Sequence, residues 1–244
     1  MEIISLAPSN TEILYKLGAE DDIVATTSLC DCPAEAARKP SIGGWTNPKI
    51  SRIHEFDADL VLASDDLQDE AVGEIEGQGY PVLQVKPHSL EEVYESIVEI
   101  GERIGKGEAA QKLVWDMKNR IEAVELEGNP RIYCEEWMDP PMVSGNWIPD
   151  LIRALDGQYP IMGGRSQEIN LDELEEFDPQ HIIFHICGSG ENLEATEIIQ
   201  SRSEWRTISA VKDQNIYTVD DSLLNRPSPR LAEAAEKIKE IIDS

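Results

Sequence analysis

Basic side chains are scarce in this sequence. Lysine and arginine number 21 against 48 aspartates and glutamates, which gives a formal net charge of −27 at pH 7. A nucleic-acid-binding surface needs clustered basic residues to neutralise phosphates, so this balance excludes nucleic acid as a partner. Because the acids are spread along the chain, we interpret them as a solvated surface adapted to high salt, where screening weakens the repulsion between carboxylates.

Long apolar runs and paired cysteines are also lacking. No run approaches the roughly 20 apolar residues of a membrane-spanning helix. Of the four cysteines, Cys30 and Cys32 flank one residue, and Cys134 and Cys187 stand alone. Zinc sites usually need Cys-x-x-Cys pairs or added histidines at matching spacing, so we expect structural or free thiols.

Catalytic motifs are absent as well. The sequence contains no phosphate-binding P-loop, no Gly-x-Gly-x-x-Gly and no Gly-x-Ser-x-Gly. His181 and His185 share one face of an expected strand, a pattern that core histidines show as readily as metal ligands. We therefore predict neither a catalytic site nor a metal site.

The length of 244 residues and the 41% hydrophobic content suit two modest α/β domains. In the first half, strands are expected at residues 3–6, 23–26, 60–63 and 82–85, alternating with helices at 9–17, 49–55 and 68–76. In the second half, strands are expected at 131–134, 181–185 and 216–219, and a last helix begins near Pro229. Such alternation is typical of parallel sheets with helices on their faces. Ser9, Asn146 and Ser228 are the expected helix N-caps.

The middle of the chain joins these halves. Apolar residues recur at helical spacing over 89–104 and again over 108–127, with a break at Gly105 and Gly107. The second helix would span roughly 30 Å at about 1.5 Å per residue, long enough to act as a rigid rod between two lobes. We therefore divide the chain into a lobe at 1–88, a connecting helical segment at 89–128 and a lobe at 129–244. The alternative is an ordinary amphipathic helix on one sheet.

A short internal repeat supports two similar lobes. Residues 50–63 match residues 171–184, with Glu-Phe-Asp identical at 55–57 and 176–178 and every apolar position kept apolar. The repeat places the same helix–turn–strand unit at the same point of each half. We expect two related lobes.

Ligands of open parallel sheets bind outside the carboxyl ends of the strands. Trp45 on a Gly-Gly loop and Trp137 beside a Pro-Pro turn are expected to face a ligand, whereas Trp115 and Trp205 are expected to pack in the protein and Trp147 fits either role. Arg226 is expected at the rim of the cleft between the lobes, where it would donate to a polar ligand group. The alternatives are buried loop tryptophans and a surface arginine paired with an acid.

With these residues in view, the chain resembles the solute-binding proteins of ABC importers for vitamin B12 and ferric siderophores, the cobalamin-binding branch in particular. The resemblance covers almost the whole chain and depends on residues 4–12, 31–33, 44–47, 59–63, 140–145 and 226–230. It implies two Rossmann-like α/β lobes with parallel sheets, joined by a single long backbone helix. It also implies a ligand held between the lobes and passed to a membrane permease.

The resemblance also implies which residues act. The expected ligand contacts are Trp45, Trp137, Met142 and Arg226, followed by Ser9, Ser64 and Asp65. Ser64, Glu136 and Ser166 stand where cobalamin binders commonly carry aromatic residues, which implies a more polar site. The family docks on its permease through an acid on each lobe. The first of these positions falls on Ser51, and Glu55 follows one turn later.

The function expected from these features is that of a non-enzymatic, monomeric binding protein. Its transported ligand is expected to be cobalamin, another corrinoid or a related metal chelate, delivered to the permease subunits of an ABC importer. Its expected location is the extracytoplasmic face of the membrane if a leader or anchor was removed, or the cytoplasm, since the sequence given contains no signal segment. One alternative is a cytoplasmic enzyme or cofactor-handling protein that uses Asp65, Glu136 or Cys187. Another is a binder of ferric siderophore or haem, which would prefer basic side chains near the ligand.

The charge balance generates the first prediction. The free energy of unfolding by urea should be higher at about 1 M than at about 0.1 M KCl, because the Debye length falls from about 10 Å to about 3 Å. A stability that is the same at both salt concentrations would remove the idea of salt adaptation.

Overall fold

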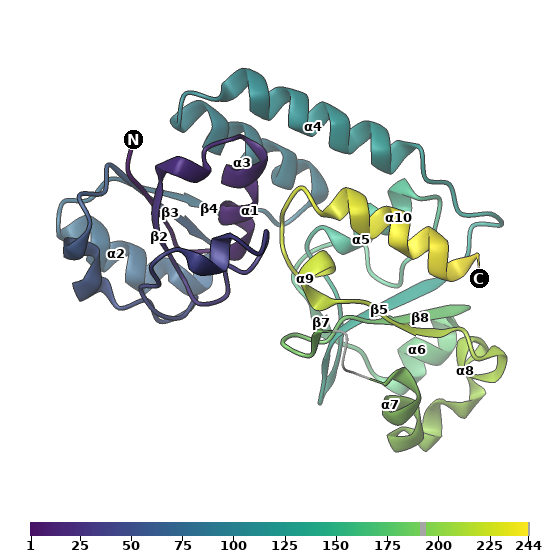
Figure 1. Ribbon diagram of the computed structural model, residues 1–244. Coiled ribbons are helices and arrows are strands. Elements are labelled where there is room, and N and C mark those ends of the chain that lie inside the picture. Colours follow the sequence, from purple (N-terminus) through teal and green to yellow (C-terminus); the bar gives the residue numbers. More distant parts are fainter. Residues whose placement is uncertain (191–193, 244) are drawn as a thin grey trace. The chain divides into compact units, whose positions relative to one another are not determined.

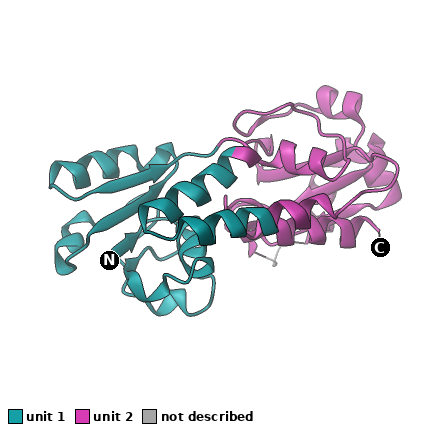
Figure 2. Ribbon diagram, turned by 90° about the horizontal axis from the view of Figure 1, so that it is seen from above, with its two compact units in different colours: residues 1–87, 92–116 teal, residues 88–91, 117–244 magenta. Residues whose placement is uncertain are grey.

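The computed structural model describes residues 1–190 and 194–243. The chain forms two compact units, shown in different colours in Figure 2. Unit 1 comprises residues 1–87 and 92–116, and unit 2 comprises residues 88–91 and 117–244. The boundary falls inside helix α4 (Gly107–Glu122), so the chain passes from one unit to the other within a helix.

Unit 1 is built on a four-stranded parallel sheet with the strand order β2-β1-β3-β4. The strands are β1 (Ile3–Ser5), β2 (Ile23–Thr26), β3 (Leu60–Ser64) and β4 (Val82–Val85). Every residue of β1 and β3 is buried. Short, continuously apolar strands are what a sheet covered on both faces requires.

Helices cover both faces of this sheet, with α1 on one face and α2 on the other in Figure 1. The α-helices are α1 (Pro8–Lys16) and α2 (Asp69–Gly77), and the 3-10 helices are η1 (Glu20–Asp22), η2 (Ala36–Arg38), η3 (Ile50–Glu55) and η4 (Asp66–Gln68). The side chains of Ile4, Ile53, Val61 and Ile75 belong to one buried cluster that joins η3, the sheet and α2.

The predicted helical segment in the middle of the chain is present as α3 (Leu90–Arg103) and α4. Helix α4 is 16 residues long and spans about 24 Å, shorter than predicted. The predicted end at residue 127 is wrong because Leu126 leaves the helix, and its N–H donates to the Leu155 carbonyl at 2.9 Å.

Trp115 on α4 contradicts the expectation that it packs in the core, since it is 65% exposed. The buried residues of this helix are Ala110, Met117 and Ile121. At 3.6 residues per turn, Trp115 lies on nearly the opposite side of the helix from them.

Unit 2 is built on a five-stranded sheet with the order β7-β6-β5-β8-β9. Strands β5 (Ile132–Met138), β8 (His181–Phe184) and β9 (Ile216–Thr218) are parallel, and β6 (Pro141–Val143) and β7 (Gln167–Glu168) are antiparallel additions. Strands β5 and β6 form a hairpin around the predicted Pro-Pro turn. Pro140 lies in the turn of this hairpin, and Pro141 is the first residue of β6.

The helices of unit 2 lie on both faces of its sheet, with α5 and α10 on one and α6 and α8 on the other (Figure 1). They are α5 (Ile148–Ala154), α6 (Leu171–Phe177), α7 (Ala195–Ser201), η6 (Ser203–Thr207), α8 (Ser209–Asp213), α9 (Asp221–Leu224) and α10 (Leu231–Ile242). None of the described helices has the length and apolarity that a membrane span requires.

Three predicted helix caps are wrong. Helix α1 begins at Pro8 after Ala7 and places Ser9 inside the helix. Helix α5 begins after Trp147, because Asn146 adopts a left-handed φ of 53°. Helix α10 begins after Arg230, whose N–H donates to the Ser228 hydroxyl at 3.2 Å. In each case the helix starts one or two residues away from the predicted position.

The internal repeat falls on equivalent elements of the two units. Residues 50–63 form η3 and most of β3, and residues 171–184 form α6 and β8. Strand β3 pairs in parallel with β1, the first strand of unit 1, and β8 pairs in parallel with β5, the first strand of unit 2. Two α/β units of related construction are therefore present, as predicted.

Candidate functional site

The strand order locates the candidate site in unit 1. The chain leaves β1 toward β2 and then crosses back to β3 on the other side of β1. Such a reversal creates a crevice at the carboxyl ends of the two central strands, where α/β proteins bind ligands. The segments at this edge follow β1 and β3 and carry Ser9, Ser64 and Asp65.

One buried side chain joins the segments at this edge. The amide of Gln68 is fully buried. Its oxygen accepts from the Ser64 N–H at 2.7 Å, and its nitrogen donates to the carbonyls of Leu6 at 3.0 Å and Trp45 at 2.7 Å. Sequence reasoning missed Gln68, because a lone glutamine before a helix gives no signal.

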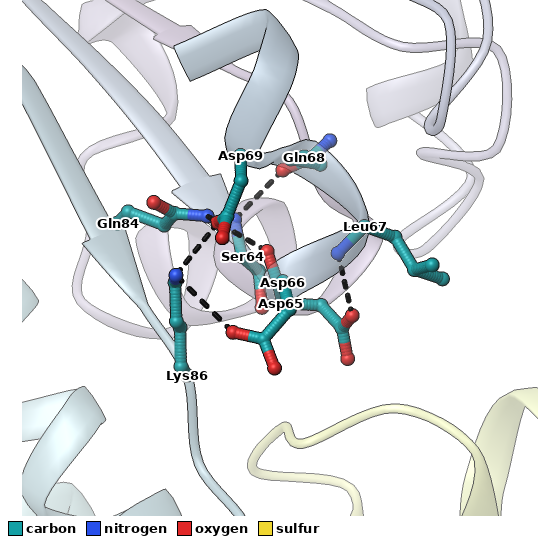
Figure 3. Close-up of polar contacts among 8 residues, drawn as sticks. All are labelled: Ser64, Asp65, Asp66, Leu67, Gln68, Asp69, Gln84 and Lys86. Atoms are coloured by element: carbon teal, nitrogen blue, oxygen red, sulfur yellow. Dashed lines mark hydrogen bonds and ion pairs between the residues drawn. The ribbon is translucent and has the colours of Figure 1, made fainter. Parts of the chain in front are cut away.

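Asp65 has an unusual backbone conformation directly after β3. Its φ of 67° and ψ of 156° lie in a region that only glycine adopts without strain. Several hydrogen bonds hold it there: its N–H donates to the Val85 carbonyl, and its carbonyl accepts from the Gln68 N–H and the Gln84 side chain. Its carboxylate accepts from the Leu67 N–H (Figure 3). Strain of this kind persists where the surroundings fix the backbone, and it is common at ligand sites.

Lys86, just after β4, lies beside the same turn. Its ammonium pairs with Asp69 at 2.6 Å and Asp66 at 3.1 Å (Figure 3). Hydrogen bonds from Lys86 and Gln84 lower the pKa of Asp69. Because these groups are well exposed, we regard the cluster as an orienting device and not as a large source of stability.

Trp45 and Asn10 carry the unpaired polar atoms of unit 1's edge. The indole N–H of Trp45 and the side-chain oxygen of Asn10 are buried without a hydrogen-bond partner among the described residues, although the Asn10 nitrogen donates to the Ala63 carbonyl at 3.0 Å. An unpaired buried polar atom costs about 1–3 kcal/mol. Departures from local rules therefore gather at the carboxyl edge of this sheet, as they do at functional sites.

In unit 2, the β5–β6 hairpin brings two of the predicted contacts together. Trp137 lies directly opposite Met142 in the antiparallel register. Trp137 is 49% exposed, and its indole N–H donates to the Asp139 carbonyl at 3.0 Å. An aromatic ring and a thioether side chain are thus held side by side near the end of β5.

A buried ion pair holds this hairpin to the unit. The guanidinium of Arg202 donates to both oxygens of Glu135 at 2.8 Å and to the Met138 carbonyl at 2.6 Å. Tyr133 also donates to Glu135, and the guanidinium lies 4.4 Å from the Trp205 ring centroid. Trp205 is buried, as predicted. Neither Arg202 nor Glu135 had been singled out by the sequence.

A second buried network holds the end of β8. His185 is fully buried, its Nδ1 faces the Asn225 side-chain oxygen, and its Nε2 lies 2.8 Å from the Ser144 hydroxyl. Burial lowers the pKa of His185 to about 4, so the ring is neutral. If Nδ1 carries the hydrogen and donates to Asn225, then Nε2 accepts from Ser144. The network links the segment after Met142 to the residue before Arg226.

The other polar groups near this edge are the Cys187 thiol and the Glu136 carboxyl group. Desolvation, with the nearby carboxylates of Glu136 and Asp221, raises the pKa of the Cys187 thiol to about 11. The thiolate is the nucleophilic form, and this shift lowers its share near pH 7. Burial also raises the pKa of Glu136, opposed by a hydrogen bond from Ser166. Among the described residues, no group of three or more His, Cys, Asp or Glu side chains is placed to hold a metal ion.

A cavity of about 550 Å³ lies elsewhere in unit 2, bordered by β7, by α6 and by Val143 and Ile161. It contains none of the predicted contacts. Trp147, which fitted either role, is buried, and its N–H donates to the Leu224 carbonyl.

The predicted contacts fall into two groups that the structure describes separately. Unit 1 holds Trp45, Ser64 and Asp65 around Gln68, and also Ser9, which is buried in α1. Unit 2 holds Trp137 and Met142 on the hairpin and Arg226 after α9. Sequence reasoning missed the apolar side chains exposed near the strand ends: Leu29 after β2, Leu67 after β3 and Met138 in β5. Their exposure has no signature in the sequence.

Comparison with known proteins agrees with this architecture. The profile of the periplasmic binding protein family matches residues 3–223, and the chain belongs to that family. It is 27% identical to an ABC transporter substrate-binding lipoprotein of Bacillus subtilis, over 99% of this chain and 79% of the relative. It is 24% identical to the vitamin B12-binding protein of Vibrio cholerae, over 97% of this chain and 87% of the relative.

A solved structure gives the same picture. The crystal structure of a possible iron-binding, periplasmic solute-binding protein from Staphylococcus epidermidis superposes with a TM-score of 0.86 at 25% identity, and the match covers 100% of this chain and 98% of that chain. The two-unit α/β fold is therefore that of periplasmic binding proteins.

The strain at Asp65 generates a prediction. Asp65→Gly and Asp65→Ala both remove the carboxylate, so their difference reports the backbone conformation. The glycine variant should be the more stable by about 1–2 kcal/mol in chemical denaturation. At Asp69, whose φ of −56° is ordinary, alanine should be the more stable of the two. The same order at both positions would contradict strain at Asp65.

Burial of His185 predicts a pH dependence. As the pH falls below about 6.5, His185 is protonated in the unfolded chain but stays neutral in the folded protein until about pH 4. The contribution of neutral His185 to the free energy of unfolding is therefore present above about pH 6.5 and is lost as the pH falls toward about 4. Wild type should lose about 2 kcal/mol more than His185→Gln between about pH 7 and about pH 5. Parallel stability curves for the two proteins would show that the imidazole is free to ionise.

Proposed function

We propose that this protein is the substrate-binding component of an ABC importer and that its ligand is a corrinoid, cobalamin or a close relative. The single observation that carries this proposal is the exposure of large apolar side chains where the strands end. Leu67 is 58% exposed in η4, shortly after β3, and Trp137 is 49% exposed in β5. Flat or bulky apolar surfaces beside a few polar groups suit a large ligand with an apolar face and a polar periphery.

The proposed contacts provide both an apolar surface for such a ligand and polar groups for its periphery. Trp45, Trp137 and Met142 supply contact area, and Arg226 supplies hydrogen-bond donors for amide or phosphate groups. Ser9, Ser64 and Asp65 are the further proposed contacts. The vitamin B12-binding relative supports the corrinoid class, and the lipoprotein relative supports a place on the extracytoplasmic face of the membrane.

The proposed docking group for the permease is Glu55. It lies on η3, well exposed, and Arg52 holds it through two hydrogen bonds of 3.0 and 2.8 Å. The hydrogen bond from Arg52 lowers the pKa of Glu55, so the carboxylate is charged when it meets a basic partner surface.

The observations favour a corrinoid binder over an enzyme and over a binder of anionic siderophore or haem. An enzyme on this scaffold would need a reactive group at the edge, and the Cys187 thiol is protonated near pH 7. A binder of an anionic siderophore or haem would need cations, and Lys86 is already paired with Asp66 and Asp69.

Calorimetric titration with cyanocobalamin, cobinamide, hemin and a ferric hydroxamate tests the proposal. We expect a corrinoid to bind most tightly, and Trp45→Ala and Trp137→Ala each to weaken it by at least about tenfold, or about 1.4 kcal/mol. Trp115→Ala is the matched control, because Trp115 is exposed on α4 away from the strand ends. Tighter binding of hemin than of any corrinoid would indicate a haem binder and contradict the proposed ligand class. No binding of any corrinoid would overturn the proposal.

A further inference from the structure

The side chain of Gln68 connects three separate segments of unit 1. It ends η4 and directly precedes α2, and it is fully buried. Its partners are Leu6 after β1, Ser64 at the end of β3 and Trp45 on the loop before η3. Figure 3 shows the Gln68 amide directed at the Ser64 backbone. Each segment carries or adjoins a proposed ligand contact.

The loop of Trp45 depends most on this amide. The base of the loop is held by backbone bonds at Ile42 and Gly43. At its tip, residues 44–48, the Gln68 side chain donates to the Trp45 carbonyl, and Pro48 pairs with Gly43 in an isolated β-bridge. Without the hydrogen bond from Gln68, the Trp45 carbonyl would lose this donor, while the buried indole N–H has no partner among the described residues in either case.

The chemistry of the partners requires an amide at position 68. Leu6 and Trp45 present carbonyls and need two N–H donors, whereas Ser64 presents an N–H and needs an acceptor. A carboxamide is the uncharged side-chain group that has two donors and an acceptor at one end. A glutamate would place oxygens against the two carbonyls. A methionine would remove the hydrogen bonds to the Ser64 N–H and the Trp45 carbonyl and leave the Leu6 carbonyl with only the Thr27 hydroxyl at 3.3 Å.

We propose that Gln68 is a positioning residue that holds Trp45 and the ends of β1 and β3 in the ligand-ready arrangement. The inference rests on the proposed function of this edge. Fixing the loop before the ligand arrives removes the free-energy cost of ordering it during binding. Loss of Gln68 therefore weakens binding even where the unit stays folded.

The test compares Gln68→Met and Gln68→Glu with Ile75→Val, a core change in α2 that lowers stability without touching Trp45. Acrylamide quenching of the Trp45 emission, isolated by subtracting the spectrum of Trp45→Phe, reports the loop without any ligand. We expect the quenching constant to rise at least about twofold in both Gln68 variants and to stay unchanged in Ile75→Val. Unchanged quenching in the folded Gln68 variants would overturn the proposal.

Two further measurements distinguish failure of this proposal from failure of the proposed function. Corrinoid affinity should fall at least about tenfold in Gln68→Met and not in Ile75→Val. If wild type binds no corrinoid, the proposed function fails, whereas the quenching result still decides the role of Gln68. If the Gln68 variants do not fold, NMR of wild type decides, because the Gln68 amide protons should exchange far more slowly than those of exposed Gln78. Equal exchange would overturn the proposal.

Discussion

The buried amide of Gln68 provides hydrogen-bond partners for backbone groups at the ends of parallel strands. Where parallel strands end, backbone groups lose their sheet partners, yet they remain too buried for water to reach. In unit 1, Gln68 satisfies the backbone groups of Leu6, Trp45 and Ser64. In unit 2, Arg202 bonds the Met138 carbonyl. The ends of the strands are therefore fixed by side chains and not left as mobile loops.

A fixed edge permits the exposure of apolar groups. An exposed leucine or tryptophan on a mobile loop folds back onto its own unit. The Leu67 N–H is instead held by the Asp65 carboxylate, and Trp137 is held by pairing in the β5–β6 hairpin and by the bond from its indole to the Asp139 carbonyl. The strain at Asp65 is consistent with this, since hydrogen bonds from and to Val85, Leu67, Gln68 and Gln84 hold a conformation that a free chain would leave. The strained backbone lowers the stability of the unit, but it maintains a surface suited to contact with a ligand.

The sequence predicted the fold through patterns that depend on neighbours in the chain. Alternating apolar runs and the repeat at residues 50–63 and 171–184 correctly indicated two α/β units. The sequence did not predict the β5–β6 hairpin, because prolines such as Pro140 and Pro141 occur in irregular loops as well as at hairpin turns. Gln68 and Arg202 also escaped it, since their partners lie far away in the sequence. Long-range hydrogen bonds leave no local pattern to read.

The central claim is that each unit holds its edge ready before the ligand binds. Crystal structures of the protein alone and with a bound corrinoid, superposed one unit at a time, test it most directly. We predict that the backbone around Trp45, Asp65 and Trp137 moves by no more than about 1 Å and that these residues touch the ligand. Movements of more than about 2 Å, or a ligand bound away from both edges, would contradict the account.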